Sequence, residues 1–169
     1  PDDHDRIEAG DQVYVIARAE KVKDVMEAFG HREREAKKLI IVGAGNVGLH
    51  LAQKIRRTSP KVDIKIIEQS QERAKYISDA LGTGVIVLHG DALEQALLEE
   101  AQAGSAETIV AVTNDDETNI FASILAKQRG CKRAITLINK HNYEALTPAL
   151  GIDAVVSPSA VTISTVLRH

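Results

Sequence analysis

Apolar and polar positions alternate in blocks along most of this chain. Short runs of Ile, Val and Leu are separated by stretches in which apolar residues recur every three or four positions. Continuous apolar runs are typical of strands buried on both faces of a parallel sheet, and the periodic stretches are typical of helices. Six strands are predicted in this way, at residues 38–42, 63–68, 85–89, 108–113, 133–138 and 154–156. Strands and helices that alternate through short connections predict an α/β fold, a doubly wound parallel sheet of the Rossmann-like type.

Two of the predicted helices have clear signals of how they pack and where they end. The helix after the first strand is expected to bury a stripe formed by Val47, Leu51 and Ile55. The helix after the second strand is expected to begin after the capping residue Ser70 and to end at Gly82.

The start of the chain has a different pattern from the rest. One short strand at 13–17 and one short helix at 21–29 cannot bury their own apolar faces. We therefore interpret residues 1–30 as the C-terminal remnant of a preceding domain and the charged segment 31–37 as a linker. The Rossmann-like domain would then occupy residues 38–169.

A glycine-rich turn, Gly43 to Gly48, follows the first predicted strand directly. Gly43 permits the backbone angles of a tight turn, Gly45 lets a pyrophosphate approach the backbone, and Gly48 lets the helix pack closely on its strand. Phosphates would face the free N–H groups and the positive dipole end of that helix. Glu68, twenty positions after Gly48, can accept hydrogen bonds from both ribose hydroxyls and would repel a 2′-phosphate, which favours NAD over NADP. The alternative is a turn that only links strand to helix, with Glu68 as a solvated strand end.

Polar residues also follow the third and fourth predicted strands. Ligands of such sheets bind outside the carboxyl ends of the strands, where strands one and four diverge. Asp91 could accept a hydrogen bond from an adenine amino group, or it could cap the next helix. Thr113 and Asn114 would lie beneath the second half of a dinucleotide, although capping is the simpler interpretation for Asn114.

Composition argues against several classes of protein. Aromatic residues make up 3% of the chain, the formal net charge is −3, and basic residues form no stripe, so nucleic acid is not supported as a partner. Cys131 is the only cysteine, which fits a reducing compartment. No apolar run approaches the ~20 residues of a membrane span, so no direct insertion into a membrane is expected. His89, His141 and His169 have no spacing that suggests a metal site.

The sequence contains no recognisable catalytic arrangement beside the glycine turn. It has no nucleophile elbow, no Walker-type lysine and no evident catalytic base. A dinucleotide site without such chemistry suggests sensing, so we do not expect an enzyme. The alternative is an NAD-dependent oxidoreductase fragment that lacks its substrate domain.

Several segments together resemble the RCK/KTN (TrkA-N) family of nucleotide-binding domains, which regulate potassium channels and transporters. The likeness runs from about Lys38 to the end of the chain, and it is greatest to the second repeat of a two-repeat regulator of potassium uptake. The residues that carry it are Gly43-Ala44-Gly45-Asn46-Val47-Gly48, Glu68, Gly90-Asp91-Ala92 and Ala111-Val112-Thr113-Asn114-Asp115-Asp116-Glu117-Thr118-Asn119.

This resemblance implies a cytoplasmic assembly that is peripheral to the inner face of the cell membrane and docked on a membrane potassium transporter subunit. NAD(H), or ATP or ADP at the same site, would bind and change the shape of a homo-oligomer, either a dimer or a tetrameric ring. Many members have an arginine in the fifth strand where this chain has Leu137. The final helix, here cut short after Ser159, crosses to a neighbouring subunit in the family. The binding residues implied by position are Gly43, Ala44, Gly45, Asn46, Val47, Gly48, Glu68, Asp91, Thr113 and Asn114.

Overall fold

The computed structural model describes residues 18, 21–28, 36–144 and 148–158, and the chain divides after Glu35 into two units. The first unit contributes one described helix, α1 (Val22–Ala28), close to the bounds predicted for it. The strand predicted at 13–17 lies outside the described residues. The second unit comprises residues 36–169 and contains all the described strands.

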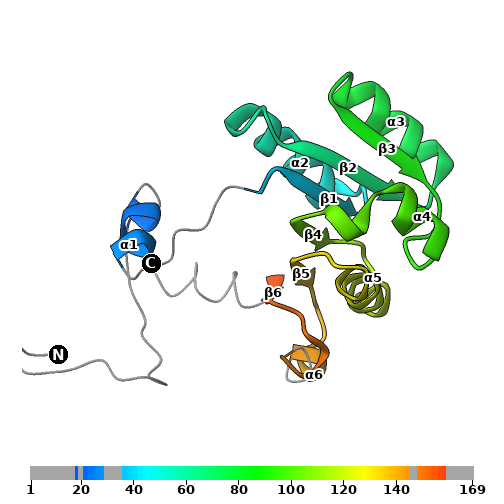
Figure 1. Ribbon diagram of the computed structural model, residues 1–169. Helices are drawn as coiled ribbons and strands as arrows, with labels where there is room; N and C mark the ends of the chain where they lie inside the picture. The colour runs from blue at the N-terminus through cyan, green and yellow to red at the C-terminus, as the bar shows by residue number, and fades with distance from the viewer. Residues whose placement is uncertain (1–17, 19–20, 29–35, 145–147, 159–169) are drawn as a thin grey trace, which may run out of the picture. The chain divides into compact units, whose positions relative to one another are not determined.

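A six-stranded sheet forms the centre of the second unit (Figure 1). All its strand pairs are parallel, in the order β3-β2-β1-β4-β5-β6. The predicted Rossmann-like fold with six parallel strands is therefore confirmed, and the order reverses between β1 and β4. The strands are β1 (Lys38–Val42), β2 (Asp63–Glu68), β3 (Val85–His89), β4 (Thr108–Ala111), β5 (Arg133–Leu137) and β6 (Ala154–Val156). The strand predicted at 108–113 ends two residues early, because Thr113 turns into the next loop.

Helices cover both faces of this sheet. They are α2 (Asn46–Thr58), α3 (Gln71–Leu81), α4 (Gln95–Glu100), α5 (Asp116–Gln128) and α6 (His141–Glu144), with short 3₁₀ turns at Ala103–Ser105 and Pro148–Leu150. Alternate residues of β1 belong to two separate apolar clusters. Ile40 and Val42 pack with side chains of α4 and α5, whereas Leu39 and Ile41 pack with those of α2 and α3. Burial on both faces explains the continuous apolar run from Leu39 to Val42 in β1.

The buried side of α2 differs from the predicted stripe. Val47 is 52% exposed, so its assignment to the core was wrong. The side chains of Leu51 and Ile55 are half-buried, and the fully covered positions are Gly48 and Ala52. The helix lies so close to β1 that only small residues fit between them, which places Val47 about 100° round the helix from the contact line.

The predicted limits of α3 are confirmed. The Ser70 hydroxyl accepts a hydrogen bond from the Arg73 N–H at 3.3 Å, and Gly82, with φ of +60°, ends the helix. The Ser70 cap fixes the loop between β2 and α3. The final helix expected after Ser159 lies outside the described residues.

Candidate functional site

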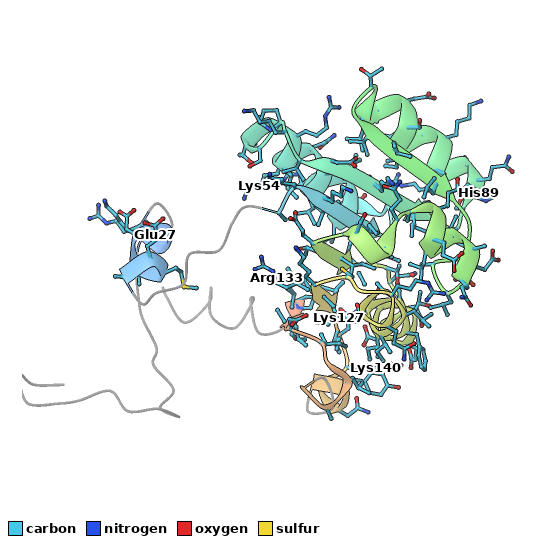
Figure 2. All side chains as sticks on the ribbon, viewed as in Figure 1. Glu27, Lys54, His89, Lys127, Arg133 and Lys140 are labelled. Carbon is cyan, nitrogen blue, oxygen red and sulfur yellow. The ribbon has the colours of Figure 1, made fainter. Side chains whose placement is uncertain are left out.

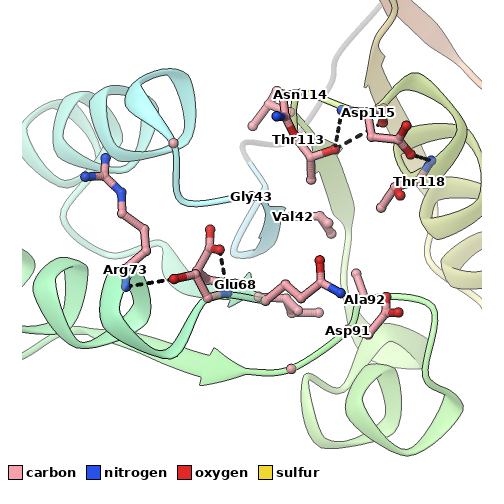
Figure 3. A pocket seen from close by; sticks show the side chains of 16 residues that line it. Val42, Gly43, Glu68, Arg73, Asp91, Ala92, Thr113, Asn114, Asp115 and Thr118 are labelled. Carbon is pink, nitrogen blue, oxygen red and sulfur yellow. Dashed lines mark hydrogen bonds between the residues drawn. The ribbon is translucent and has the colours of Figure 1, made fainter.

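A cleft of about 420 Å³ opens at the carboxyl ends of β1, β2, β3 and β4. Sixteen residues line it, and they come from these strand ends and the loops that follow (Figure 3). The cleft includes the point where the strand order reverses, which is the usual ligand position in open α/β sheets. Its volume lies within the range of small-molecule sites.

The glycine turn forms one wall of the cleft. Gly43 has φ of +95°, and a Cβ there would lie 2.9 Å from the Thr113 backbone nitrogen. Gly45 is the N-cap of α2 and lines the cleft, and a Cβ there would have no atom within 4 Å. The first N–H groups of α2 have no partner within the helix, so the wall offers hydrogen-bond donors and room for a phosphate.

The Glu68 carboxylate, at the end of β2, is aimed at this turn. Its Oε2 accepts a hydrogen bond from the Ala44 N–H at 2.7 Å, and its Oε1 accepts one from the Ser70 N–H at 2.8 Å. The side chain is half-buried and lines the cleft. Because a carboxylate oxygen can accept a second hydrogen bond, Glu68 remains able to bind a ribose hydroxyl while it stays anchored.

Asp91 lines the cleft after β3 but does not cap a helix. The α4 helix begins four residues later at Gln95, with Glu94 at its N-cap position, so the capping alternative was wrong. Asp91 Oδ1 instead accepts a hydrogen bond from the Leu93 N–H at 2.9 Å and forms a local turn. The turn holds the carboxylate at the rim of the cleft.

The loop after β4 is held by a buried asparagine. Asn119 is completely buried, and its Oδ1 accepts hydrogen bonds from the Thr113 N–H at 2.8 Å and the Thr113 hydroxyl at 2.7 Å. Its Nδ2 donates to Thr113 O at 3.1 Å and to Leu137 O at 3.0 Å. Asp115 caps α5, since its Oδ2 accepts from the Thr118 N–H at 2.7 Å. These bonds fix Thr113, Asn114 and Asp115, which all line the cleft.

The structure brings six of the ten predicted site residues to the cleft wall. These are Gly43, Gly45, Glu68, Asp91, Thr113 and Asn114. Ala44 and Gly48 are buried behind the turn, and Asn46 and Val47 are exposed in the first turn of α2 without lining the cleft.

The site also contains residues that sequence reasoning did not select. Gln69, Ser70 and Arg73 line the cleft from the β2–α3 segment, and Asp115 and Thr118 line it from the start of α5. The available signal was position: each residue follows a strand that ends at the cleft, either in the connection to the next helix or in the first turn of that helix.

Next to the cleft, the start of α5 is bonded to the segment after β5. The Asp116 carboxylate, 3% exposed, accepts hydrogen bonds from the Asn139 N–H at 3.0 Å and the Lys140 N–H at 2.8 Å. Burial opposes its ionisation, but these bonds outweigh burial and lower the pKa of Asp116. Glu117 Oε1 accepts from Lys140 Nζ and the Tyr143 hydroxyl, both at 2.8 Å, and these two bonds lower its pKa to about 2.

The Glu117 contacts predict a pH dependence of folding stability. The pKa of Glu117 lies near 2 in the folded chain against an ordinary value of 4.5, so its contribution is complete above about pH 4.5 and is lost as the pH falls toward 2. Urea unfolding of the parent and Glu117→Gln at pH 7, 5, 4 and 3 measures this. We expect the variant to be less stable at pH 7, with the difference shrinking below pH 4.5. Parallel curves for the two proteins would contradict the assignment.

Other charged groups are spread over different elements. Lys54 lies on α2, Lys127 on α5 and Lys140 after β5 (Figure 2). Within the described ranges no group of three or more His, Cys, Asp or Glu side chains could hold a metal ion. In that same part of the chain no helix has the length and apolar character needed to cross a membrane.

Comparison with known proteins connects this site to one family. The TrkA-N domain model matches residues 39–158. The Trk system potassium uptake protein TrkA of Azorhizobium caulinodans is 42% identical over 165 residues, which cover 98% of this chain and 36% of that protein. The TrkA protein of Halomonas elongata is 39% identical over 163 residues, with 96% and 35% covered. The chain thus spans about a third of the length of these curated relatives.

Solved structures have the same fold. The TrkA-N domain of the inner membrane protein ybaL from Escherichia coli matches with a TM-score of 0.70 at 18% identity, covering 80% of this chain and 98% of that domain. GsuK bound to ADP matches with a TM-score of 0.63 at 25% identity, covering 77% and 32%. The GsuK channel bound to NAD matches with a TM-score of 0.61 at 16% identity, covering 79% and 27%.

Proposed function

The chain belongs to the TrkA-N domain family, and from this we propose that it is a nucleotide-sensing domain of a potassium uptake regulator. A ligand in the cleft that binds one conformation of the regulator more tightly than another shifts the population between them. The shift gates ion transport through a membrane potassium transporter subunit. The names of the relatives support this role, since they are called potassium uptake proteins.

The proposed ligand is NAD(H), with ATP or ADP as alternatives at the same site. The observation that carries this proposal is the Glu68 carboxylate, which is anchored to the Ala44 N–H at 2.7 Å in the wall of the cleft. A carboxylate in that position accepts ribose hydroxyls and disfavours a 2′-phosphate. The titles of two GsuK structures, bound to NAD and to ADP, agree with this ligand class.

The same proposal extends to the organisation of the whole protein. We assign residues 38–169 to the second nucleotide-binding repeat, residues 31–37 to a linker and residues 1–30 to the end of the preceding repeat. The protein would act as a homo-oligomer, a dimer or tetrameric ring, in the cytoplasm at the inner face of the membrane. Size measurement of the full-length protein by light scattering tests the oligomer directly.

An oxidoreductase fragment is the less favoured function. The family agrees with the expectation that the chain is not an enzyme, because the relatives are named for potassium uptake and not for a reaction. Hydride transfer to any substrate by the full-length protein would revive that alternative.

Substitution of Glu68 tests the proposed ligand site. Calorimetric titration of the parent, Glu68→Ala and Glu72→Ala with NAD⁺, NADH, ATP and ADP is the measurement. Hydrogen bonds to charged groups contribute about 1.5–3 kcal/mol, so we expect Glu68→Ala to weaken the best ligand by about 10- to 100-fold. Glu72→Ala removes an exposed carboxylate from α3 and should bind like the parent. Failure of all four ligands to bind the parent would refute the proposal.

A further inference from the structure

Acidic side chains outnumber basic ones around the cleft, which is unfavourable for an anionic ligand. Three of the sixteen lining residues, Glu68, Asp91 and Asp115, are carboxylates. Arg73 is the only one of the sixteen described lining residues that carries a positive charge. A nucleotide phosphate entering the cleft would be repelled by three groups and attracted by one side chain and the N-terminus of α2.

Arg73 is held in place by contacts along its whole length. Its backbone N–H is bonded to the Ser70 hydroxyl at 3.3 Å, and its Nε donates to Ala44 O at 2.8 Å. Its guanidinium carbon lies 5.1 Å from the centre of the Tyr76 ring. The side chain therefore runs from α3 toward the turn that precedes α2 (Figure 3).

The two terminal nitrogens of Arg73 remain free for a ligand. Neither makes a hydrogen bond to another described residue, and neither is among the buried polar atoms of the described chain that lack a partner. Both atoms therefore keep some exposed surface, and Arg73 is one of the residues that line the cleft. An arginine whose Nε is anchored presents these nitrogens in a fixed fork, which matches two phosphate oxygens better than a lysine does.

One residue of the turn, Ala44, links this arginine to the proposed ribose contact through its N–H and its carbonyl. The Ala44 N–H donates to Glu68 Oε2 at 2.7 Å, and the Ala44 carbonyl accepts from Arg73 Nε at 2.8 Å. Glu68 and Arg73 are thus both fixed against the turn, one acidic and one basic. In a nucleotide, the ribose hydroxyls would pair with Glu68 and the negatively charged phosphate with Arg73.

We propose that Arg73 binds the phosphate of the ligand's adenosine half through its terminal nitrogens, so that the cleft selects adenosine phosphates over adenosine. This inference rests on the proposed function, because it assumes that an adenine nucleotide occupies the cleft. It adds to the proposed function the residue that attracts the phosphate, Arg73, and the ligand that the cleft would disfavour, adenosine without a phosphate.

Comparison of ADP with adenosine tests the role of Arg73. ADP binding is measured by calorimetry and adenosine binding by ligand-observed NMR, for the parent, Arg73→Ala, Arg73→Lys and the control Lys75→Ala. Lys75 is an exposed cation on the same helix and does not line the cleft. We expect Arg73→Ala to lower the ratio of ADP to adenosine affinity at least tenfold, Arg73→Lys to lower it less, and Lys75→Ala to leave it within twofold.

The outcomes distinguish this inference from its premise. Equal loss of ADP and adenosine binding in Arg73→Ala would overturn it, since a stacking or structural role weakens both ligands alike. Unchanged ADP binding would overturn it as well. If neither ADP nor NADH binds the parent, the proposed function fails and the inference fails with it. Thermal unfolding of each variant establishes that the binding data come from folded protein.

Discussion

Replacing Gly48 with alanine is expected to destabilise the domain by about 3 kcal/mol or more. A Cβ at this position would lie 2.0 Å from the Gly43 carbonyl oxygen and 3.3 Å from Ile41 Cγ2. The first contact is with backbone, so no side-chain rotation relieves it, and α2 must move away from β1. The helix propensity that alanine adds, about 1 kcal/mol at most, does not offset that movement. Urea unfolding followed by circular dichroism measures the loss.

Gly45→Ala is the matched control for this substitution. It adds the same methyl group three residues earlier, where no atom lies within 4 Å and φ is −64°. Alanine is a poorer N-cap than glycine, so we expect a loss of about 1 kcal/mol or less. If Gly48→Ala proved as stable as Gly45→Ala, the close approach of α2 to β1 would be refuted. The control should also weaken nucleotide binding, because Gly45 lines the cleft and the added methyl group would take up open space beside it.

The apolar pattern predicted the sheet well because burial on both faces leaves a strong signal. Leu39, Ile40, Ile41 and Val42 alternate between the two apolar clusters, so every residue of β1 except Lys38 is buried. The pattern failed on α2, where the contact with β1 is made by Gly48 and Ala52 rather than by large side chains. Glycine has no apolar side chain, so a pattern of hydrophobic residues does not show that it lies at a contact. The predicted buried stripe therefore included Val47 in place of Gly48.

The predicted residues line the cleft where backbone position alone determines their place. Gly43, Glu68 and Asp91 lie at strand ends, and parallel strands bring their carboxyl ends to one edge of the sheet. Arg73 was missed because its place depends on how α3 directs a long side chain back toward Ala44. Asn119 belonged to the recognised segment, but its bonds to Thr113 and Leu137 depend on tertiary packing, which a linear pattern does not contain.

Replacing Asn119 with alanine is expected to destabilise the domain by about 3 kcal/mol. The substitution leaves the part-buried Thr113 N–H and Leu137 carbonyl without their side-chain partner. A polar group that is left unsatisfied in a buried position costs about 1–3 kcal/mol. Asn114→Ala is the control, since Asn114 is exposed, and it should change stability by no more than about 0.5 kcal/mol. Urea unfolding measures both. Equal stability of the two variants would show that the buried amide contributes nothing.

Asn119→Asp tests the contribution of the amide donor, Nδ2, separately from that of the acceptor, Oδ1. An aspartate keeps an oxygen for the Thr113 N–H but turns a second oxygen toward the carbonyls of Thr113 and Leu137. Burial raises the pKa of such a carboxyl, and a protonated carboxyl can donate to one of the two carbonyls. The folded-state pKa then exceeds the unfolded value, so the variant gains stability relative to the parent as the pH falls through that raised pKa. If the difference in unfolding free energy between Asn119→Asp and the parent stayed constant from pH 8 to pH 5, the proposed role of the Asn119 Nδ2 donor in joining the cleft loop to β5 would be contradicted.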